Sequence, residues 1–471
     1  MDSIETDLCI IGAGSGGLSV AAGAVQMGAR TVLVEAGEMG GDCLNAGCVP
    51  SKALLAAAKA AHAAQGGRFG VTGHATVDFA AAKDHVAATI AAIAPHDSEE
   101  RFEGLGVRVI RAFGRFVDPQ TVEAGGFRIR ARRFVIATGS RPVIPPIDGI
   151  DGVDVLTNET VFALRDRPDH LLIFGGGPIG IEMAQAHRRL GCAVTVIEAA
   201  RALGREDAEA AAVVLAALRR EGVEIIEGTG IARVARDGSG IAATLADGRV
   251  VRGSHLLVAA GRRVALAGMG LDAGGIAHTD RGITVRDDLR STTNRRVYAV
   301  GDAAGGAQFT HLAGYHAGIV IRRAVLGLPA RQRDGHIPRV TYTDPELAHV
   351  GPDAAEVERR FGSRAQVLRV PYAGNDRAQA EGRTEGFVKL TVARGRVVAA
   401  TVAGHQAGEV IAPLVLAVSA RMKVAALAGA VLPYPTLAEL GKRAAGAYFS
   451  PKLFDNAALK GWVRLVQRFL P

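Results

Sequence analysis

Residues 8–17 read LCIIGAGSGG, a short apolar run that ends in a cluster of glycines. An alanine-rich segment, 18–28, follows it, and a second apolar run, Thr31–Val34, ends at Glu35. This order predicts a strand, a glycine turn, a helix and a second strand that ends in an acid. Glycine clusters also mark ordinary turns, but this flanking context favours a dinucleotide-binding unit, in which a pyrophosphate approaches the helix N-terminus and the acid binds a ribose. The cofactor-binding residues expected here are Gly12, Gly14, Gly17 and Glu35.

The same pattern recurs in the middle of the chain. Residues 171–180 read LLIFGGGPIG, a helix-like stretch runs on to Leu190, and the apolar run 194–197 ends at Glu198. Two such units imply two bound dinucleotides, and an electron relay between them is the simplest interpretation. A carboxylate suits a free ribose 2′-hydroxyl, so Glu198 favours NAD over NADP, although Arg201 nearby leaves NADP open. The residues expected to bind this second dinucleotide are Gly175, Gly177, Gly180 and Glu198.

Composition limits the class of protein. The chain has 471 residues, of which 48% are hydrophobic and 22% charged, so we expect about three packed domains rather than disorder. No apolar run approaches the roughly 20 residues that a membrane helix needs. Acids near the start (Asp2, Glu5, Asp7) argue against a signal peptide, so a cytoplasmic location is expected. The net charge of +8 is scattered, and no nucleic-acid partner is expected.

Two of the four cysteines form a close pair. Residues 40–52 read GGDCLNAGCVPSK, and the segment 52–64 is strongly helical in composition, so Cys43 and Cys48 are expected near a helix N-terminus. That position lowers the pKa of a thiol. Two inert buried cysteines or half of a metal site are the alternatives. No second Cys or His pair stands at zinc spacing, so no metal site is expected, and a redox-active pair is favoured. Cys9 and Cys192 are expected to be buried and inert.

The motif at 40–52 resembles that of the class I pyridine nucleotide–disulfide oxidoreductases, the family of dihydrolipoamide dehydrogenase, glutathione reductase and mercuric reductase. Residues 343–346 (TDPE) resemble the start of the family's interface domain, and residues 297–302 (VYAVGD) resemble its second flavin-binding strand. The resemblance implies FAD and NAD as cofactors and a homodimer with active sites at the interface.

The resemblance also implies an α/β fold with two Rossmann-like dinucleotide-binding domains and a C-terminal α+β dimerisation domain. From near Pro338 the sequence shows a pattern of alternating strands, such as 387–392 and 396–402, which agrees with this last domain. The predicted division is 1–148 for the first part of the FAD-binding domain, 149–265 for the NAD-binding domain, 266–335 for the second, central part of the FAD-binding domain, and 336–471 for the interface domain with an amphipathic C-terminal tail.

Several roles follow from matching the family's motifs. Cys48 matches the cysteine that faces the flavin as a thiolate, and Cys43 matches the interchange cysteine that meets the substrate. Lys52 matches the lysine near the reactive flavin nitrogen, paired with a glutamate that matches Glu182. A redox-active Cys43–Cys48 disulfide would then exchange electrons with a small-molecule or protein-borne disulfide. The further cofactor-binding positions expected are Gly114, Thr138, Gly139, Gly261, Asp302 and Thr310.

One position departs from the thiol-substrate enzymes. They carry a histidine, a proline after it and a glutamate five positions after the histidine, which together move protons to and from the interchange cysteine. Here the glutamate is Glu439, but Tyr434 stands at the base position. A phenol titrates near 10, so it cannot act as a base at neutral pH, although it can donate a hydrogen bond. His311 and His405 are expected to be structural or surface residues rather than substitutes.

The departure leaves the substrate open. Mercuric reductase also carries a tyrosine at this place. Three features argue against that activity: no metal-binding domain precedes the first strand, residues 467–471 (QRFLP) lack its paired cysteines, and mercuric reductases usually take NADPH, which Glu198 disfavours. Dihydrolipoamide dehydrogenase-like exchange with a dithiol or disulfide is therefore favoured. A mercuric or other metal-ion reductase and a redox-responsive binding protein are the alternatives.

The segment after Phe454 is amphipathic. Apolar residues recur at helical spacing from Leu459 to Leu470, and basic residues form a stripe between them at Lys460, Arg464 and Arg468. Packing on the dimer is favoured for such a helix, and contact with a membrane surface or with a partner is the alternative.

Overall fold

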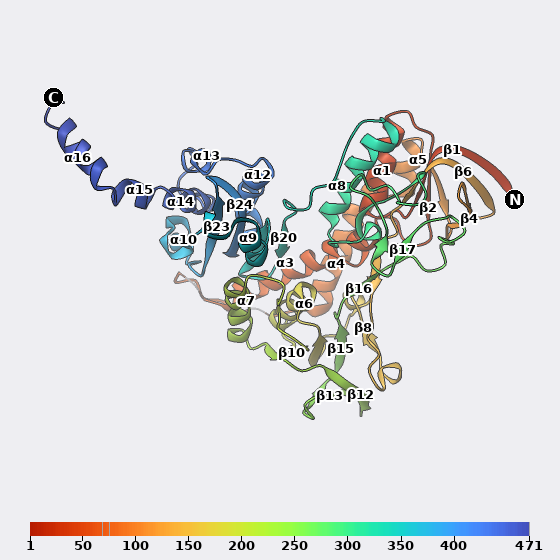
Figure 1. The fold of residues 1–471 in the computed structure, drawn as a ribbon. Helices are drawn as coiled ribbons and strands as arrows, with labels where there is room; N and C mark the ends of the chain where they lie inside the picture. The colour runs from red at the N-terminus through yellow and green to blue at the C-terminus, as the bar shows by residue number, and fades with distance from the viewer. Residues whose placement is uncertain (68, 75, 471) are drawn as a thin grey trace. The chain divides into compact units, whose positions relative to one another are not determined.

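The computed structural model describes residues 1–67, 69–74 and 76–470. The chain divides into two compact units. The first unit comprises Met1–Ala200 and Val223–Arg333, and the second comprises Arg201–Gly222 and Asp334–Pro471. Figure 1 colours the chain from red at the N-terminus to blue at the C-terminus, so the C-terminal part of the second unit is blue.

The first unit is built on a mainly parallel sheet. Its strand order is β3-β2-β1-β6-β5-β4, and β19 pairs with β6. Strands β1, β2, β3, β6 and β19 run parallel, while β4 and β5 continue the sheet in antiparallel fashion. The predicted order of strand, turn, helix and strand is confirmed, with α1 at Ser15–Gln26. The strands are β1 (Asp2–Ile11), β2 (Thr31–Glu35), β3 (Arg108–Arg111), β4 (Arg115–Asp118), β5 (Thr121–Ala124), β6 (Phe127–Ile136) and β19 (Val297–Ala299).

The end of β1 is buried on both faces. Leu8 and Ile10 join one apolar cluster, whereas Cys9 and Ile11 join another on the opposite face. This alternation is what a strand inside a covered parallel sheet requires. Helices α1 and α8 (Thr310–Val320) contribute to the first cluster. Because a slip by one residue would exchange the two faces, the packing fixes where β1 ends and where the glycine turn begins.

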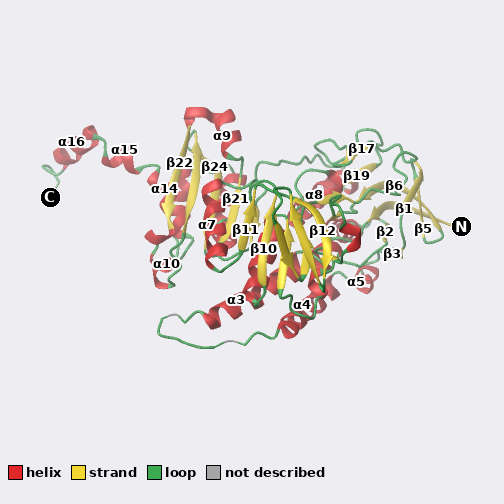
Figure 2. Ribbon diagram, turned by 90° about the horizontal axis from the view of Figure 1, so that it is seen from below, coloured by secondary structure: helices red, strands yellow, loops and turns green. Residues whose placement is uncertain are grey.

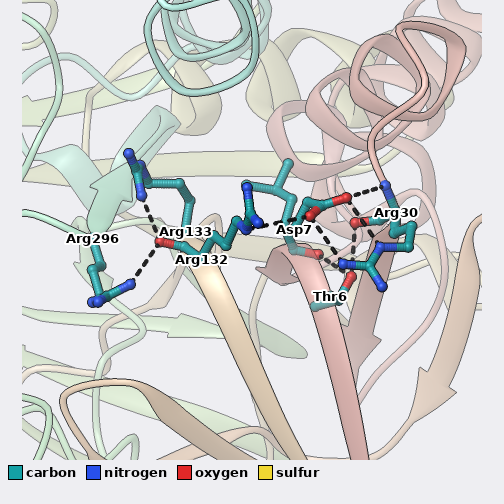
Figure 3. Close-up of polar contacts among 7 residues, drawn as sticks. Thr6, Asp7, Arg30, Arg132, Arg133 and Arg296 are labelled. Atoms are coloured by element: carbon teal, nitrogen blue, oxygen red, sulfur yellow. Dashed lines mark hydrogen bonds and ion pairs between the residues drawn. The ribbon is translucent and has the colours of Figure 1, made fainter.

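Polar contacts fasten the strands beside β1 (Figure 3). Asp7 accepts hydrogen bonds from the backbone N–H of Arg30 at 3.0 Å and from its Nε at 3.2 Å, while Thr6 Oγ1 donates to the Arg30 carbonyl at 2.7 Å. Arg132 Nε lies 3.7 Å from the same carboxylate, and the Arg132 carbonyl accepts from Arg296. The hydrogen bonds from Arg30 lower the pKa of Asp7. These contacts tie the residues before β2 and within β6 to β1.

A second parallel sheet carries the second glycine-rich turn. Its order is β11-β10-β9-β15-β8, and every neighbouring pair is parallel. Helix α6 (Pro178–Arg189) connects β9 to β10, which confirms the second predicted unit. The strands are β8 (Val155–Leu156), β9 (His170–Phe174), β10 (Ala193–Glu198), β11 (Glu224–Glu227) and β15 (His255–Val258).

Smaller elements complete the first unit. Helix α3 packs against α4 and α6. Within the described residues, no helix has both the length and the apolar composition needed to cross a bilayer. The remaining elements are α2 (Gly41–Asn45), α3 (Cys48–Gln65), α4 (Phe79–Ile93), α5 (Glu99–Gly104), the pair β7 (Ser140–Pro142) and β16 (Arg262–Val264), the meander β12 (Ile231–Asp237), β13 (Gly240–Leu245) and β14 (Val250–Gly253), and the pair β17 (His278–Thr279) and β18 (Gly282–Ile283).

The second unit is an antiparallel sheet covered by helices. The strand order is β20-β21-β24-β23-β22, and the strands predicted at 387–392 and 396–402 are confirmed. Helix α7 (Ala208–Arg220) belongs to this unit: Lys389 Nζ lies 2.8 Å from both Asp207, which caps the helix, and Glu209 in its first turn. The strands are β20 (Arg339–Thr341), β21 (Glu346–Val350), β22 (Ala365–Pro371), β23 (Gly386–Ala393) and β24 (Arg396–Gly404).

The helices that follow the sheet of the second unit lead to a C-terminal extension. Beyond α14, helices α15 and α16 extend away from the sheet of the second unit in both views (Figures 1 and 2), and none of their described side chains is buried. The helices of the unit are α9 (Ala354–Phe361), α10 (Asp376–Ala380), α11 (Ala407–Val410), α12 (Ala412–Ser419), α13 (Val424–Ala428), α14 (Glu439–Ala447), α15 (Ser450–Phe454) and α16 (Ala457–Val466).

Candidate active site

Two positive-φ glycines lead the chain from β2 into the cysteine pair. Gly40 and Gly41 have φ angles of 85° and 60°, which side chains with a Cβ rarely adopt. A Cβ on Gly41 would lie 2.8 Å from the Cα of Gly14, and a β-bridge joins Gly14 to Gly40. The cysteine segment therefore lies directly against the first glycine turn. This contact places a redox-capable pair beside a dinucleotide-binding turn.

The cysteines lie on consecutive short elements. Cys43 is in α2, and Cys48 is the first residue of α3, as expected from the helical composition of 52–64. The two sulfurs are not joined by a disulfide. Cys48 Sγ lies 3.3 Å from Thr310 Oγ1, the residue that begins α8. Cys9 and Cys192 are fully buried, as predicted.

The two thiols differ in acidity. The pKa of Cys48 is lowered to about 6, first by the hydrogen bond from Cys43, then by Thr310 and by the charge of Lys52; burial acts in the opposite direction. The pKa of Cys43 is raised, first because its thiol donates to Cys48 and also because of burial. At neutral pH the pair therefore holds a thiolate on Cys48 and a proton on Cys43.

Lys52 and Glu182 form an ion pair beside the cysteines. Lys52 Nζ lies 2.9 Å from Glu182 Oε2, which joins α3 to α6. Glu182 is buried and Lys52 is half-buried, so the ammonium is held in place one turn after Cys48. The pairing that the family resemblance implied is thus present in the geometry.

A hydrogen-bond network holds the turn that carries Cys43. Asp42 Oδ1 accepts from Asn158 Nδ2 at 2.9 Å and lies 3.0 Å from Arg262 Nη2. Asn158 also donates to the Ala46 carbonyl at 3.0 Å. Arg262 Nε donates to Ser140 Oγ at 2.8 Å, and this network continues to Asp302. Residues from distant parts of the chain therefore fix both ends of α2.

The first glycine turn has the shape of a phosphate cradle. A Cβ on Gly12 would lie 2.4 Å from the Ala137 carbonyl oxygen, and one on Gly17 would lie 1.8 Å from the Gly12 carbonyl oxygen, so neither position has room for a side chain. Gly14, by contrast, has no atom closer than 4.0 Å to such a Cβ. The middle glycine thus leaves open space above the N-terminus of α1, where a pyrophosphate fits. Glu35 accepts from the N–H of Ala13 at 2.5 Å.

The second glycine turn repeats this geometry. A Cβ on Gly175 would lie 2.4 Å from the Ala259 carbonyl oxygen, and one on Gly180 would lie 1.9 Å from the Gly175 carbonyl oxygen, whereas Gly177 has open space around it. Glu198 accepts from the N–H of Gly176 at 2.7 Å. Both turns therefore have the shape that a dinucleotide requires.

The other predicted cofactor positions differ in their surroundings. Thr138 follows Ala137 at the end of β6, and its buried hydroxyl has no hydrogen-bond partner, which suits a site completed by a ligand. Asp302 accepts from Ser140 Oγ at 2.5 Å, and burial raises its pKa. Gly139 and Gly261 have positive φ and open space, whereas a Cβ on Gly114 would lie 3.2 to 3.5 Å from core side chains of the first sheet.

Tyr434 and Glu439 lie in the second unit. The Tyr434 hydroxyl is exposed and donates to Asp376 Oδ2 at 2.9 Å, an interaction that raises the pKa of the phenol. Glu439 is the first residue of α14, and its carboxylate lies 3.4 Å from the N–H of Thr436. Each therefore has a partner of its own, and their catalytic roles stay predictions.

Sequence reasoning missed the residues that hold the cysteine turn. Asn158 and Arg262 carry no local motif of their own, because their importance comes from contacts with Asp42 across the fold. Ser15, which adds a hydrogen bond to Cys43, was visible only as a polar residue inside the first glycine cluster. That position next to Gly14 was the one available signal.

Comparisons with known proteins agree with this geometry. Residues 6–317 match the family Pyridine nucleotide-disulphide oxidoreductase, and residues 337–445 match its dimerisation domain. A mercuric reductase of Streptomyces lividans is 38% identical over 460 residues, 94% of this chain and 96% of the relative. A dihydrolipoyl dehydrogenase of Geobacillus stearothermophilus is 32% identical over 455 residues, 94% of this chain and 96% of the relative.

Among solved structures, LpdA of Mycobacterium tuberculosis superposes with a TM-score of 0.87 at 28% sequence identity, covering 94% of this chain and 99% of that one. The glycine turns, the cysteine pair and the dimerisation domain thus agree with the sequence matches over nearly the whole length. The chain belongs to the pyridine nucleotide-disulphide oxidoreductases, a family of FAD-dependent enzymes that use NAD(P).

Proposed function

We propose that this protein oxidises NADH and delivers the electrons through Cys48 and Cys43 to a disulfide acceptor. The observation that carries the proposal is the polarised pair: the pKa of Cys48 is lowered to about 6, while Cys43 keeps its proton and lies on the neighbouring short helix. Inert structural cysteines need no such polarisation. Cys9 and Cys192, whose pKa values are raised by burial, illustrate the difference.

The residues present fit FAD at the first turn. Gly14 offers the open space for its pyrophosphate, Glu35 keeps free lone pairs for ribose hydroxyls, and Thr138 and Asp302 provide further polar contacts. FAD held by these residues would supply two-electron transfer between a nicotinamide and the Cys43–Cys48 disulfide. The ammonium of Lys52, held by Glu182, would stabilise negative charge that develops next to Cys48.

The exchange with substrate uses both thiols. Cys43 loses its proton, attacks one sulfur of the acceptor and expels the other as a thiolate. The Cys48 thiolate then attacks Cys43, forms the Cys43–Cys48 disulfide and releases the second substrate thiolate. The two thiolates are protonated by the proton from Cys43 and one from solvent, so two electrons and two protons reach the acceptor.

Tyr434 is suited to hold an acceptor rather than to act as a base. Its pKa is raised by the hydrogen bond to Asp376, so the phenol keeps its proton throughout the neutral range. Such a group can donate a hydrogen bond to a bound acceptor but cannot remove a proton from an incoming dithiol. The family's homodimeric arrangement, which the dimerisation domain supports, would bring Tyr434 of one subunit to Cys43 of the other.

Glu198 supports NADH as the electron donor. A carboxylate at the end of β10 accepts hydrogen bonds from a 2′-hydroxyl and repels a 2′-phosphate. Kinetics with both donors test this preference: we expect a higher kcat/KM for NADH, and a higher value for NADPH would contradict it. Four cysteines in 471 residues form no disulfide framework, which suits the reducing cytoplasm, where we propose that the protein works.

A soft metal ion is the second candidate acceptor. Two observations favour it: a tyrosine replaces the histidine base, and the relative at 38% identity is a mercuric reductase. Two neighbouring thiolates are good ligands for such ions. No proton needs to be removed from a metal ion, so the missing base would matter less.

Anaerobic NADH oxidation with a panel of acceptors separates the candidates. Lipoamide and glutathione disulfide represent disulfides, and Hg(II) represents soft metal ions. We expect disulfide-dependent turnover that Cys43→Ser and Cys48→Ser each abolish. Turnover with Hg(II) alone would move the assignment to the second candidate. Turnover that survives both substitutions would contradict a role for the pair.

A further inference from the structure

We propose that helix α16 is an in-plane anchor that binds the protein to the surface of an anionic lipid membrane. The helix starts at a defined cap, because Asn456 Oδ1 accepts from the N–H of Leu459 at 3.1 Å. It ends at Val466, so its 10 residues span about 15 Å, half the thickness of a bilayer core. A helix of this length lies along a membrane rather than across it.

The apolar side of α16 is exposed. At 3.6 residues per turn its apolar residues fall within an arc of roughly 160°. Trp462 is 62% exposed and Val463 is 48% exposed, and the turn that follows adds Phe469 at 79%. The side chains on this arc are Leu459, Trp462, Val463, Leu465 and Val466. An aromatic and aliphatic face of this kind, held away from the sheet of its own unit (Figures 1 and 2), needs an apolar environment.

The opposite side of α16 indicates which environment it meets. Lys460 and Arg464 share the polar face, Arg468 follows in the next turn, and residues 456–470 contain no acid. A helix packed on protein keeps its polar face in water, where charges of both signs serve equally well. An entirely basic face instead complements the negative potential of a lipid surface, to which each basic residue contributes roughly five-fold in binding. Trp462, near the middle of the apolar arc, is of a residue type enriched at the interface between membrane and water.

The chain offers a direct probe, because Trp462 is its single tryptophan. The holoenzyme is mixed with vesicles of phosphatidylcholine alone or of phosphatidylcholine and phosphatidylglycerol in equal parts. We expect the Trp462 emission to shift to the blue only with the anionic vesicles, and the shift to reverse as added salt screens the charges. Sedimentation of the vesicles measures the bound fraction in parallel.

Paired substitutions separate the charge from the apolar face. Replacing Lys460, Arg464 and Arg468 by Gln should weaken membrane binding on the order of 100-fold, because each basic residue contributes roughly five-fold to binding and all three are lost. The control Lys460→Arg, Arg464→Lys and Arg468→Lys keeps the charges and should bind like the parent. Val463→Glu should abolish the blue shift, whereas Val463→Leu should retain it. NADH oxidation in solution should be the same for all of these variants.

Two results would overturn the proposal. One is emission that stays unchanged with anionic vesicles while the protein remains in the supernatant. The other is emission that is already blue without vesicles and moves to the red when the protein is diluted, because this would show that the helix packs on a second copy of the chain.

Discussion

Cys48 owes its acidity to neighbours from three separate elements. Cys43 on α2 donates a hydrogen bond, Thr310 at the start of α8 lies 3.3 Å away, and Lys52 adds a positive charge one turn along α3. These effects favour the thiolate and outweigh the burial that opposes it. The sign of the pH dependence follows directly: Cys48 is a thiolate above its folded pKa and becomes a neutral thiol as the pH falls through that value.

The pH dependence of Cys48 reactivity is the first prediction. In the reduced protein, alkylation of Cys48 by iodoacetamide should rise with pH and reach half its plateau rate near pH 6, because only the thiolate reacts. Peptide mapping by mass spectrometry distinguishes Cys48 from Cys43, which should react only at higher pH. A midpoint near the ordinary value for cysteine would contradict the polarised pair.

Lys52 provides the matched test of the electrostatic cause. Lys52→Met should shift the midpoint of Cys48 alkylation to higher pH, because the neighbouring positive charge is lost. Lys59→Met removes an exposed lysine from the same helix and should leave the midpoint in place. Equal shifts for both variants would point to a general change in net charge instead.

At the scale of elements, α2 is too short to hold its own position. It spans five residues, and its cap residue Gly40 offers no side chain. Contacts from outside the helix therefore fix it: Asn158 and Arg262 bind Asp42 near its start, and Asn158 also binds the Ala46 carbonyl just after its end. The position of Cys43 thus depends on residues that belong to other segments of the first unit.

Arg262→Ala tests this dependence. Loss of the contacts to Asp42 and Ser140 should let α2 move and lower kcat/KM for the acceptor on the order of 10- to 100-fold, because catalysis is sensitive to small displacements. Binding of NADH should change little. Arg263→Ala, at the next and exposed position, is the control and should behave like the parent. Equal activity in the two variants would mean that the network does not position Cys43.

The glycine turns give a prediction with internal controls. Gly17→Ala and Gly180→Ala place a Cβ within 2 Å of a carbonyl oxygen, so they should destabilise the fold by about 3 kcal/mol or more, measured by thermal unfolding. Gly14→Ala and Gly177→Ala have room for the methyl group and should fold normally. They should nevertheless bind FAD and NADH, respectively, more weakly, because the methyl group occupies the space of the pyrophosphate. Normal cofactor binding by both would contradict the assigned cradles.

The sequence predicts those features of the site that are encoded by local spacing. The glycine turns, the acids Glu35 and Glu198 and the cysteine pair are recognisable because each set lies within a short stretch of chain. Asn158 could not be predicted, since its hydrogen bond to Asp42 joins residues 116 positions apart. The hydrogen bond from Tyr434 to Asp376 could not be predicted either, because only the fold of the second unit brings these two residues together.

For the whole molecule, the central question is how the two units cooperate. The first unit holds Cys43, Cys48, Lys52 and Glu182, whereas Tyr434 lies in the second. The dimerisation domain supports a homodimer, and the family resemblance implies active sites built from both subunits. Tyr434 would then serve the cysteine pair of its partner subunit. The strand pattern near 387–402 indicated a C-terminal α+β domain, but the sequence of one chain contains no direct sign of contacts between two copies.

Mixed dimers test this arrangement. Cys43→Ser and Tyr434→Phe homodimers should each lose activity, the latter by up to about 100-fold through loss of a hydrogen bond to the acceptor. Co-expression of the two variants produces dimers in which one site combines an intact Cys43 with an intact Tyr434 from the other subunit. About half of the parent activity per mixed dimer is expected, since one of the two sites is whole. If the mixed dimers were no more active than the average of the Cys43→Ser and Tyr434→Phe homodimers, the two subunits would not share a site.

The most direct test of the account is to count thiols before and after NADH. The air-oxidised holoenzyme receives one equivalent of NADH without oxygen, is alkylated under denaturing conditions, and its four cysteines are mapped by mass spectrometry. We expect NADH to convert Cys43 and Cys48 together from a disulfide to two thiols that are then alkylated, while Cys9 and Cys192 are alkylated to the same extent in both samples. Unchanged labelling of Cys43 and Cys48 would show that the electrons from NADH do not pass through the pair.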